Sequence, residues 1–231
     1  MMTTEVKIDR ALAIKVLEVV DAGLVSGMGK PIPGQMCVEA AVCYAMGLPH
    51  SDEPTCVAPS LRALKIKLND SSWSSNAART KGLRRLAIAQ LGSQGALDEK
   101  RFAQNLVSLV IRKYVPIALR AAASRHPKRE HKDALEAAAK RCETEVSKEA
   151  ALNARDVSKY ADASASASAS ASADASAYAS AYASADASAS AKFGAVRDGV
   201  LGQFAEDVVS ILIEMKAPGC EFLDLTEQVA A

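Results

Sequence analysis

The sequence is poor in aromatic residues and has no long apolar run. Aromatic residues make up 4% of its 231 residues, whereas hydrophobic residues as a whole reach 49%. Alanine accounts for much of the difference, and an alanine-rich chain is typical of closely packed helices because alanine is the best helix former. No apolar run approaches the ~18 residues that a membrane-spanning helix needs. We therefore expect a soluble helical protein that has no membrane partner.

A strong net charge and an even set of cysteines are also missing. The net charge is +1, which gives no overall reason to expect binding to nucleic acid or to a membrane surface. The five cysteines are an odd number and lack the spacing of a disulfide framework. The first ten residues lack the apolar core of a secretory signal. We expect a cytoplasmic protein with reduced thiols.

Helical periodicity recurs along most of the chain and predicts an all-α fold, a compact multi-helix bundle in one domain over residues 1–231. Pro116 is expected to kink the longest periodic segment, because proline removes a backbone donor. Residues 130–160 alternate alanine with charges, as in a mostly exposed helix, and His126 and His131 are expected in solvent. The other predicted helices span residues 8–23, 37–46, 60–68, 77–91, 97–124 and 195–216. Along the chain we expect motif-bearing helices in 1–95, long kinked and charged helices in 96–160, a low-complexity helix in 161–191 and a core helix in 192–231.

Residues 161–191 form a low-complexity tract in which alanine alternates with Ser, Asp or Tyr. Strict alternation is typical of a strand, but alanine favours a helix and β-branched residues are absent from the tract. Asp174, Tyr178, Tyr182 and Asp186 recur at intervals of four, which makes them neighbours on a helix. We expect a long Ala/Ser-rich helix, with disorder as the alternative. Self-association through this repeat is a further hypothesis.

Chemically reactive side chains are concentrated in residues 34–56, which hold three of the five cysteines. Cys37 opens a predicted helix, where unpaired backbone N–H groups and the helix dipole favour a thiolate. His50 and Asp52 follow, and a cysteine with a histidine and a carboxylate is the set that thiol hydrolases use. These three are the candidate catalytic residues of a cysteine-dependent hydrolase or transferase. The alternative is that Cys37 and Cys43 are core residues and His50 lies in a loop.

The same segment contains four residues of the types that bind zinc, Cys37, Cys43, His50 and Cys56. Their spacing differs from the Cys-x2-Cys pairs of structural zinc sites, and a six-residue step on a helix turns two ligands apart. We therefore expect no metal, and nothing else in the sequence indicates a cofactor.

Residues 60–85 hold seven Lys or Arg side chains against one acid, together with the only tryptophan. Three interpretations are open: a solvated helix face, a site for an anionic ligand, or a nucleic-acid contact with the tryptophan as a stacking platform. Because a single aromatic accompanies the block and the net charge is near zero, nucleic acid is the least favoured. The candidate ligand-binding residues are Arg62, Lys65, Asn69, Asp70, Trp73, Arg79 and Arg84.

A longer pattern is the run Cys37-Val-Glu-Ala-Ala-Val-Cys-Tyr-Ala-Met-Gly-Leu-Pro-His-Ser-Asp-Glu-Pro-Thr-Cys56, followed by Arg62 and the pair Asn69-Asp70. This pattern resembles a family of hypothetical proteins from bacteria and phages, over residues 35–92 closely and over the rest loosely. The family has no assigned activity, so the resemblance implies a prokaryotic or viral, cytosolic setting and no catalytic roles. The tail departs from the family pattern, because serine alternates where denser alanine and tyrosine would be expected.

The sequence thus favours a soluble binding or interaction protein. Its surface over residues 50–85 is expected to hold an anionic small molecule or a protein partner. The thiol enzyme and the self-associating structural protein are the alternatives, and a homo-oligomer is compatible with each of them.

Overall fold

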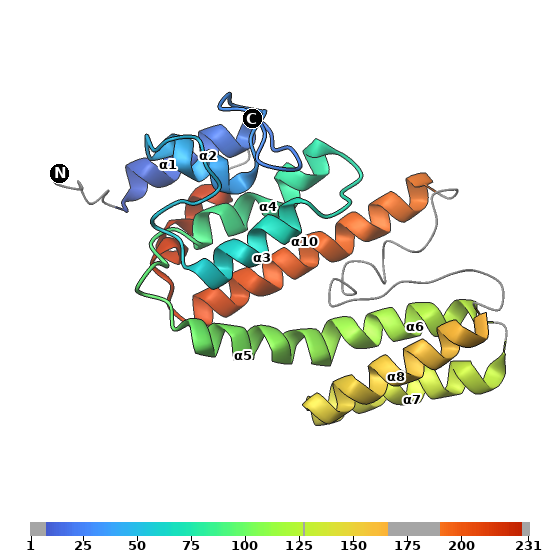
Figure 1. Cartoon of the computed structure of the whole chain (residues 1–231). Coiled ribbons are helices and arrows are strands. Elements are labelled where there is room, and N and C mark those ends of the chain that lie inside the picture. Colours follow the sequence, from blue (N-terminus) through green and yellow to red (C-terminus); the bar gives the residue numbers. More distant parts are fainter. Residues whose placement is uncertain (1–7, 127, 166–189, 228–231) are drawn as a thin grey trace. The chain divides into compact units, whose positions relative to one another are not determined.

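A computed structural model describes residues 8–126, 128–165 and 190–227 (Figure 1). In these ranges the regular elements are all helical; β-structure is limited to two isolated bridges, Leu24 to Met36 and Gly29 to Met36. The predicted all-α multi-helix bundle is confirmed. Contacts divide the chain into two compact units, Met1–Ala103 with Ala187–Ala231, and Gln104–Asp186. A single domain over residues 1–231 stays a prediction.

The first unit is arranged around α4 (Asn76–Ala89). This helix packs against α1 (Arg10–Asp21), α2 (Val38–Ala45), α10 (Ser190–Glu214) and the 3-10 helix η3 (Pro218–Thr226), while α3 (Pro59–Asn69) packs against α2. The apolar side chains in the second half of α4 are completely buried, which is why the helix lies at the centre. They are Leu83, Leu86, Ala87, Ile88 and Ala89.

Local signals in the sequence explain where these helices begin. Asp9 caps α1 by accepting a hydrogen bond from the Leu12 amide at 3.0 Å, and Ser75 caps α4 by accepting one from the Ala78 amide at 3.1 Å. Gly219 allows η3 to approach α4 closely, because a Cβ at this position would collide with the Ile88 carbonyl.

The second unit contains the end of α5 (Glu99–Leu109), a π-helical turn η1 (Val110–Tyr114), α6 (Val115–Arg125), α7 (Arg129–Glu145) and α8 (Lys148–Ala165). The π-turn lies directly before Pro116, where a kink was predicted. Proline lacks a backbone N–H and its ring crowds the preceding turn, and a wider turn relieves both problems.

The prediction of one mostly exposed helix over residues 130–160 is wrong. Val146 adopts a left-handed conformation with φ 45° and ψ 46°, which ends α7 and allows α8 to pack back on it. The alanines and the cysteine of this stretch form the core between the two helices. Buried side chains there are Leu135, Ala138, Ala139, Cys142, Ala150 and Ala154.

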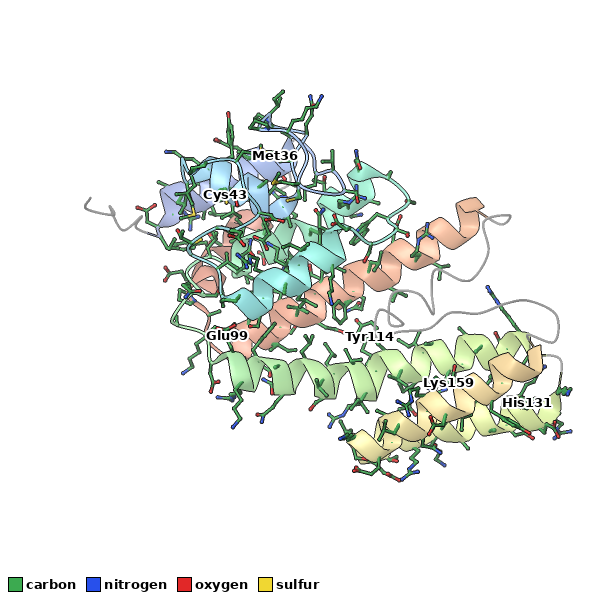
Figure 2. All side chains as sticks on the ribbon, in the orientation of Figure 1. Met36, Cys43, Glu99, Tyr114, His131 and Lys159 are labelled. Carbon is green, nitrogen blue, oxygen red and sulfur yellow. The ribbon has the colours of Figure 1, made fainter. Side chains whose placement is uncertain are left out.

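The prediction that His126 and His131 lie in solvent is also wrong, since both are buried and their ring centroids are 4.6 Å apart. His126 Nδ1 accepts a hydrogen bond from the Lys128 amide at 3.1 Å, so Nε2 carries the proton that it donates to the Ala161 carbonyl at 3.3 Å. The ring therefore joins the α6–α7 connection to α8. Figure 2 labels His131 in this region.

Most of the Ala/Ser-rich tract lies outside the described residues. Its described ends are helical, with residues 161–165 in α8 and residues 190–191 in α10. No helix within the described ranges is long and apolar enough to cross a membrane.

Candidate functional site

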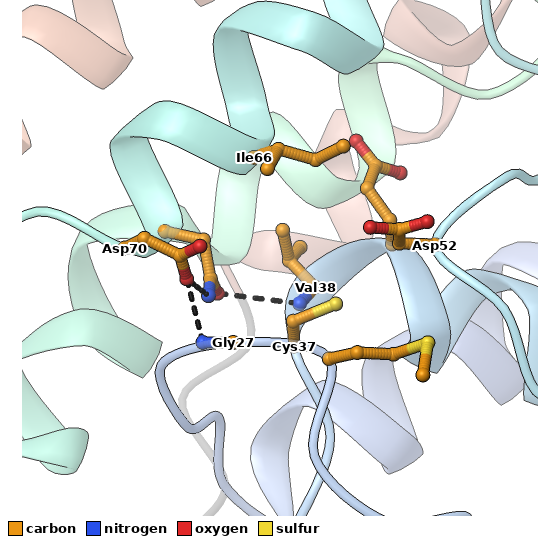
Figure 3. A pocket seen from close by; sticks show the side chains of 9 residues that line it. Gly27, Cys37, Val38, Asp52, Ile66 and Asp70 are labelled. Carbon is orange, nitrogen blue, oxygen red and sulfur yellow. Dashed lines mark hydrogen bonds between the residues drawn. The ribbon is translucent and has the colours of Figure 1, made fainter.

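A small pocket lies at the start of α2 in the first unit (Figure 3). In Figure 3 Asp70 stands beside Gly27 on one side, Asp52 stands on the other, and Cys37 and Val38 lie between them. The cavity volume is about 10 Å³, which is close to the minimum that holds a water molecule. The walls are formed by Gly27, Met28, Cys37, Val38, Glu39, Asp52, Ile66, Asn69 and Asp70.

One wall of the pocket is the loop of residues 24–36 between α1 and α2, which Asp70 fastens to the end of α3. Asp70 Oδ1 accepts hydrogen bonds from the Gly27 amide at 2.7 Å and from the Ser26 hydroxyl at 3.4 Å. Gly29 has φ +74°, and a Cβ there would collide with the Gln35 carbonyl. The loop is therefore held in one compact conformation.

Three backbone donors at the start of α2, the amides of Val38, Ala40 and Ala41, have acceptors within the chain. Cys37 is the N-cap, and its Sγ accepts a hydrogen bond from the Ala40 amide at 3.3 Å. Asn69 Oδ1 accepts from the Val38 amide at 3.3 Å, and the Ala41 amide donates to the Cys37 carbonyl at 2.9 Å. Asn69, a predicted ligand-binding residue, thus joins α3 to α2 at the edge of the pocket.

The structure brings two of the three predicted catalytic residues to the pocket. Cys37 and Asp52 line the pocket, whereas the His50 ring is engaged elsewhere, with Nε2 3.2 Å from the Gly29 carbonyl. Burial raises the pKa of the Cys37 thiol; the amides at the helix start lower it by less, and Glu39 and Asp52 raise it further. The helix-start effect expected from the sequence is therefore present but is outweighed by burial. Catalysis by these three residues stays a prediction.

Beside the pocket, α2 and α3 are joined by an ion pair between Glu39 and Lys65. Glu39 Oε1 and Lys65 Nζ are 3.5 Å apart and both side chains are fully buried. Burial raises the pKa of Glu39 and lowers that of Lys65, and each shift is opposed by the charge of the other residue. Neither side chain has a hydrogen bond of good geometry, and the buried Gln90 amide next to Glu39 has none either.

The other basic residues between Ser60 and Arg85 mostly have partners within the chain. Arg62 pairs with Glu53 at 3.1 Å, and Arg85 lies 3.2 Å from Glu206. Arg84 donates to Asp21 Oδ1 at 2.7 Å and to the Thr226 carbonyl at 2.6 Å.

Arg79 and Trp73 are buried parts of the first unit. Arg79 Nε donates to the Asn69 carbonyl at 2.8 Å, and its side chain also bonds Asn76. Trp73 Nε1 donates to the Leu68 carbonyl at 2.9 Å. Of the seven predicted ligand-binding residues, the structure places Asn69 and Asp70 in the pocket and gives the other five contacts elsewhere; their ligand-binding role stays a prediction.

Sequence reasoning missed Glu39, although a signal was present. Glu39 is the only charged residue in the run Val38–Ala45, and Lys65 occupies a position on the same helix face as the buried Leu61 and Leu68. One acid and one base on two otherwise apolar faces are consistent with a buried pair, since isolated buried charges are rare.

No group of three or more His, Cys, Asp or Glu side chains among the described residues could hold a metal ion. The cysteines are all free, and Cys37, Cys43 and Cys56 are buried near the Glu39–Lys65 pair. Comparison with known proteins finds no matching family model, curated protein or solved structure.

Proposed function

We propose that the protein is a binding protein and that the pocket at the start of α2 holds a polar group of its ligand. The observation that carries this proposal is Glu39, a fully buried carboxylate that lines the pocket and whose oxygens have no hydrogen bond of good geometry beyond the 3.5 Å ion pair with Lys65. A buried acceptor without a donor costs about 1–3 kcal/mol, and more when it is charged. A ligand donor in the pocket would remove that cost.

The framework around the pocket supports binding because hydrogen bonds within the chain hold its walls. Asp70 holds the 24–36 loop, and Asn69 joins the end of α3 to the start of α2. A preformed site binds without a large cost for ordering its walls.

Binding is favoured over thiol catalysis by the state of the two candidate groups. A nucleophilic cysteine needs a lowered pKa, and burial raises the pKa of Cys37. A general base must also lie within reach of the thiol, and His50 is not among the residues that line the pocket with Cys37; its ring lies against the Gly29 carbonyl, with Nε2 3.2 Å from the oxygen.

The proposal also changes the sign of the ligand expected from the sequence. An anionic ligand requires available cations, and Arg62, Lys65, Arg79 and Arg84 all have partners within the chain. A protein partner remains compatible with the pocket, because one inserted side chain could fill it.

The test is a thermal-shift titration of the whole chain with methylammonium, guanidinium, acetamide, acetate and phosphate at constant ionic strength. At least one probe should raise the Tm in a saturable manner, as expected for a ligand that binds only the folded state. The variant Asp52→Leu should abolish the shift, whereas Glu53→Leu, on the same segment but outside the pocket wall, should preserve it. If no probe shifts the wild type, or if every shift survives Asp52→Leu, the proposal is overturned.

A further inference from the structure

The charges around the pocket have one sign. Glu39, Asp52 and Asp70 line it, and no Lys, Arg or His side chain is among its lining residues. Lys65 is not a lining residue, and its charge is paired with that of Glu39 at 3.5 Å. The start of α2 contributes at most about half a positive charge, which the remaining carboxylates of Asp52 and Asp70 outweigh. The pocket is suited to a cation.

The charged hydrogen-bonding groups of the pocket are acceptors, and the Asn69 side-chain amide already donates to the Val25 carbonyl and to Asp70. The amides of Val38, Ala40 and Ala41 at the start of α2 are already bonded within the chain. Neither Glu39 oxygen has a hydrogen bond of good geometry, and Oε1 is in a 3.5 Å ion pair with Lys65. The Asp52 carboxylate lies across the pocket from Asp70 (Figure 3). A group that complements these carboxylates carries several donors, and an ammonium group carries three.

The size of the cavity limits the cation further. About 10 Å³ accommodates one group the size of a water molecule. An ammonium head has this size, whereas a planar guanidinium is larger. The apolar side chains of Met28 and Ile66 in the wall provide contacts for an alkyl chain that follows the ammonium.

We infer that the pocket binds a protonated primary amine on an alkyl chain, with the ammonium between Glu39, Asp52 and Asp70. The inference rests on the proposed binding function and names its ligand class. A free alkylamine and a lysine side chain of a protein partner present the same chemistry, and the experiment distinguishes these two sources.

The experiment is isothermal titration calorimetry of the whole chain with n-butylammonium, butanoate and n-butanol, which differ mainly in charge. Only n-butylammonium should bind to the wild type. Asp52→Asn removes a charge with almost no change in shape and should weaken binding roughly tenfold or more, as expected for the loss of a charge-assisted hydrogen bond. Glu53→Gln makes the same charge change outside the pocket wall and should leave the affinity unchanged.

The two proposals fail in different ways. If butanoate or n-butanol binds, and Asp52→Leu abolishes that binding, the amine inference is wrong and the binding function stands. If n-butylammonium binds equally well to wild type and Asp52→Asn, the inference is wrong as well. If none of the three compounds binds, and no probe of the thermal-shift panel raises the Tm, both proposals are overturned.

A second titration identifies the source of the amine. Nα-acetyl-lysine N-methylamide carries the same ammonium on a peptide-like backbone. Binding about tenfold tighter than n-butylammonium would assign the pocket to a lysine side chain, because the 24–36 loop would then contact the peptide groups. Weaker binding would assign it to a free alkylamine.

Discussion

Glu39 on α2 and Lys65 on α3 form an ion pair that is completely removed from solvent, with Oε1 and Nζ 3.5 Å apart. A buried pair of this kind contributes little net stability compared with apolar residues of the same shape, because removing two charges from water is costly. The loss of a single partner is far more damaging, since it leaves an uncompensated charge. The pair joins α2 to α3 beside the pocket.

The first prediction concerns the energetic coupling between Glu39 and Lys65. Lys65→Met should lower the free energy of unfolding by about 3–5 kcal/mol, because Glu39 would remain buried without its partner. The double variant Glu39→Met with Lys65→Met should recover most of that loss, since it removes both desolvation costs. Urea denaturation of the wild type, the two single variants and the double variant gives the coupling energy. Additive losses would show that the two side chains do not interact.

The second prediction concerns the dependence of stability on pH and follows from the pKa shifts of Glu39 and Lys65. Burial raises the pKa of Glu39 above its ordinary 4.5, so between 4.5 and the folded value the native state holds a proton that the unfolded chain releases. The free energy of unfolding therefore falls as the pH rises through that window. Burial lowers the pKa of Lys65 below its ordinary 10.5, so stability is lost as the pH falls from 10.5 through the folded value.

The pair should therefore contribute least at intermediate pH and more towards either end of the range. Denaturation of the wild type and of the double variant over the same pH series isolates this contribution. If the two stability profiles run parallel, Glu39 and Lys65 titrate alike in the folded and unfolded states.

The helices of the first unit were predictable because local sequence decides them. Asp9 and Ser75 cap α1 and α4 as such residues do at helix starts, and the apolar spacing marks the buried faces. The split between α7 and α8 was not predictable in this way. It depends on Val146 in a left-handed conformation, which a β-branched residue rarely adopts and which packing must enforce.

The site was predictable only as a region. Cys37, Asp52, Asn69 and Asp70 were selected from the sequence and do meet at one pocket. Their chemistry was not predictable, because it depends on burial: the thiol pKa is raised, and Lys65, expected at a basic surface, lies inside against Glu39. Burial arises from contacts between α2 and α3, which composition and periodicity do not contain.

The third prediction concerns the thiols. Burial raises the pKa of Cys37 and raises that of Cys43 to about 12, so both thiolates should be scarce at neutral pH. Because the thiolate is the reactive form, iodoacetamide at about pH 7 should modify neither residue in the folded protein. Cys220 is partly exposed whereas the other four cysteines are buried, so access to the reagent should make it react first as the pH is raised, although burial raises its pKa to about 11. Mass spectrometry of the labelled peptides, with urea-unfolded protein as the control, measures this order. Rapid alkylation of Cys37 below pH 7 would restore the enzyme hypothesis.

The fourth prediction concerns Gly82 in α4, which lies against the buried ring of Trp73. A Cβ at Gly82 would collide with the six-membered part of that ring. Alanine is about 1 kcal/mol better than glycine inside a helix, but overpacking a core costs about 1–3 kcal/mol. Gly82→Ala should therefore destabilise the protein and displace the indole from the Leu68 carbonyl, to which it donates a hydrogen bond at 2.9 Å.

Fluorescence reports this displacement directly, because Trp73 is the only tryptophan in the chain. The emission of Gly82→Ala should move to longer wavelength as the ring gains contact with water, and the urea midpoint should fall. Gly199→Ala in α10 is the matched control, since a Cβ there meets nothing within 4 Å, and it should stabilise the protein by up to about 1 kcal/mol. If both variants stabilise the chain and leave the emission unchanged, the indole does not pack against Gly82, and the close contact of α4 with the 70–75 turn is wrong.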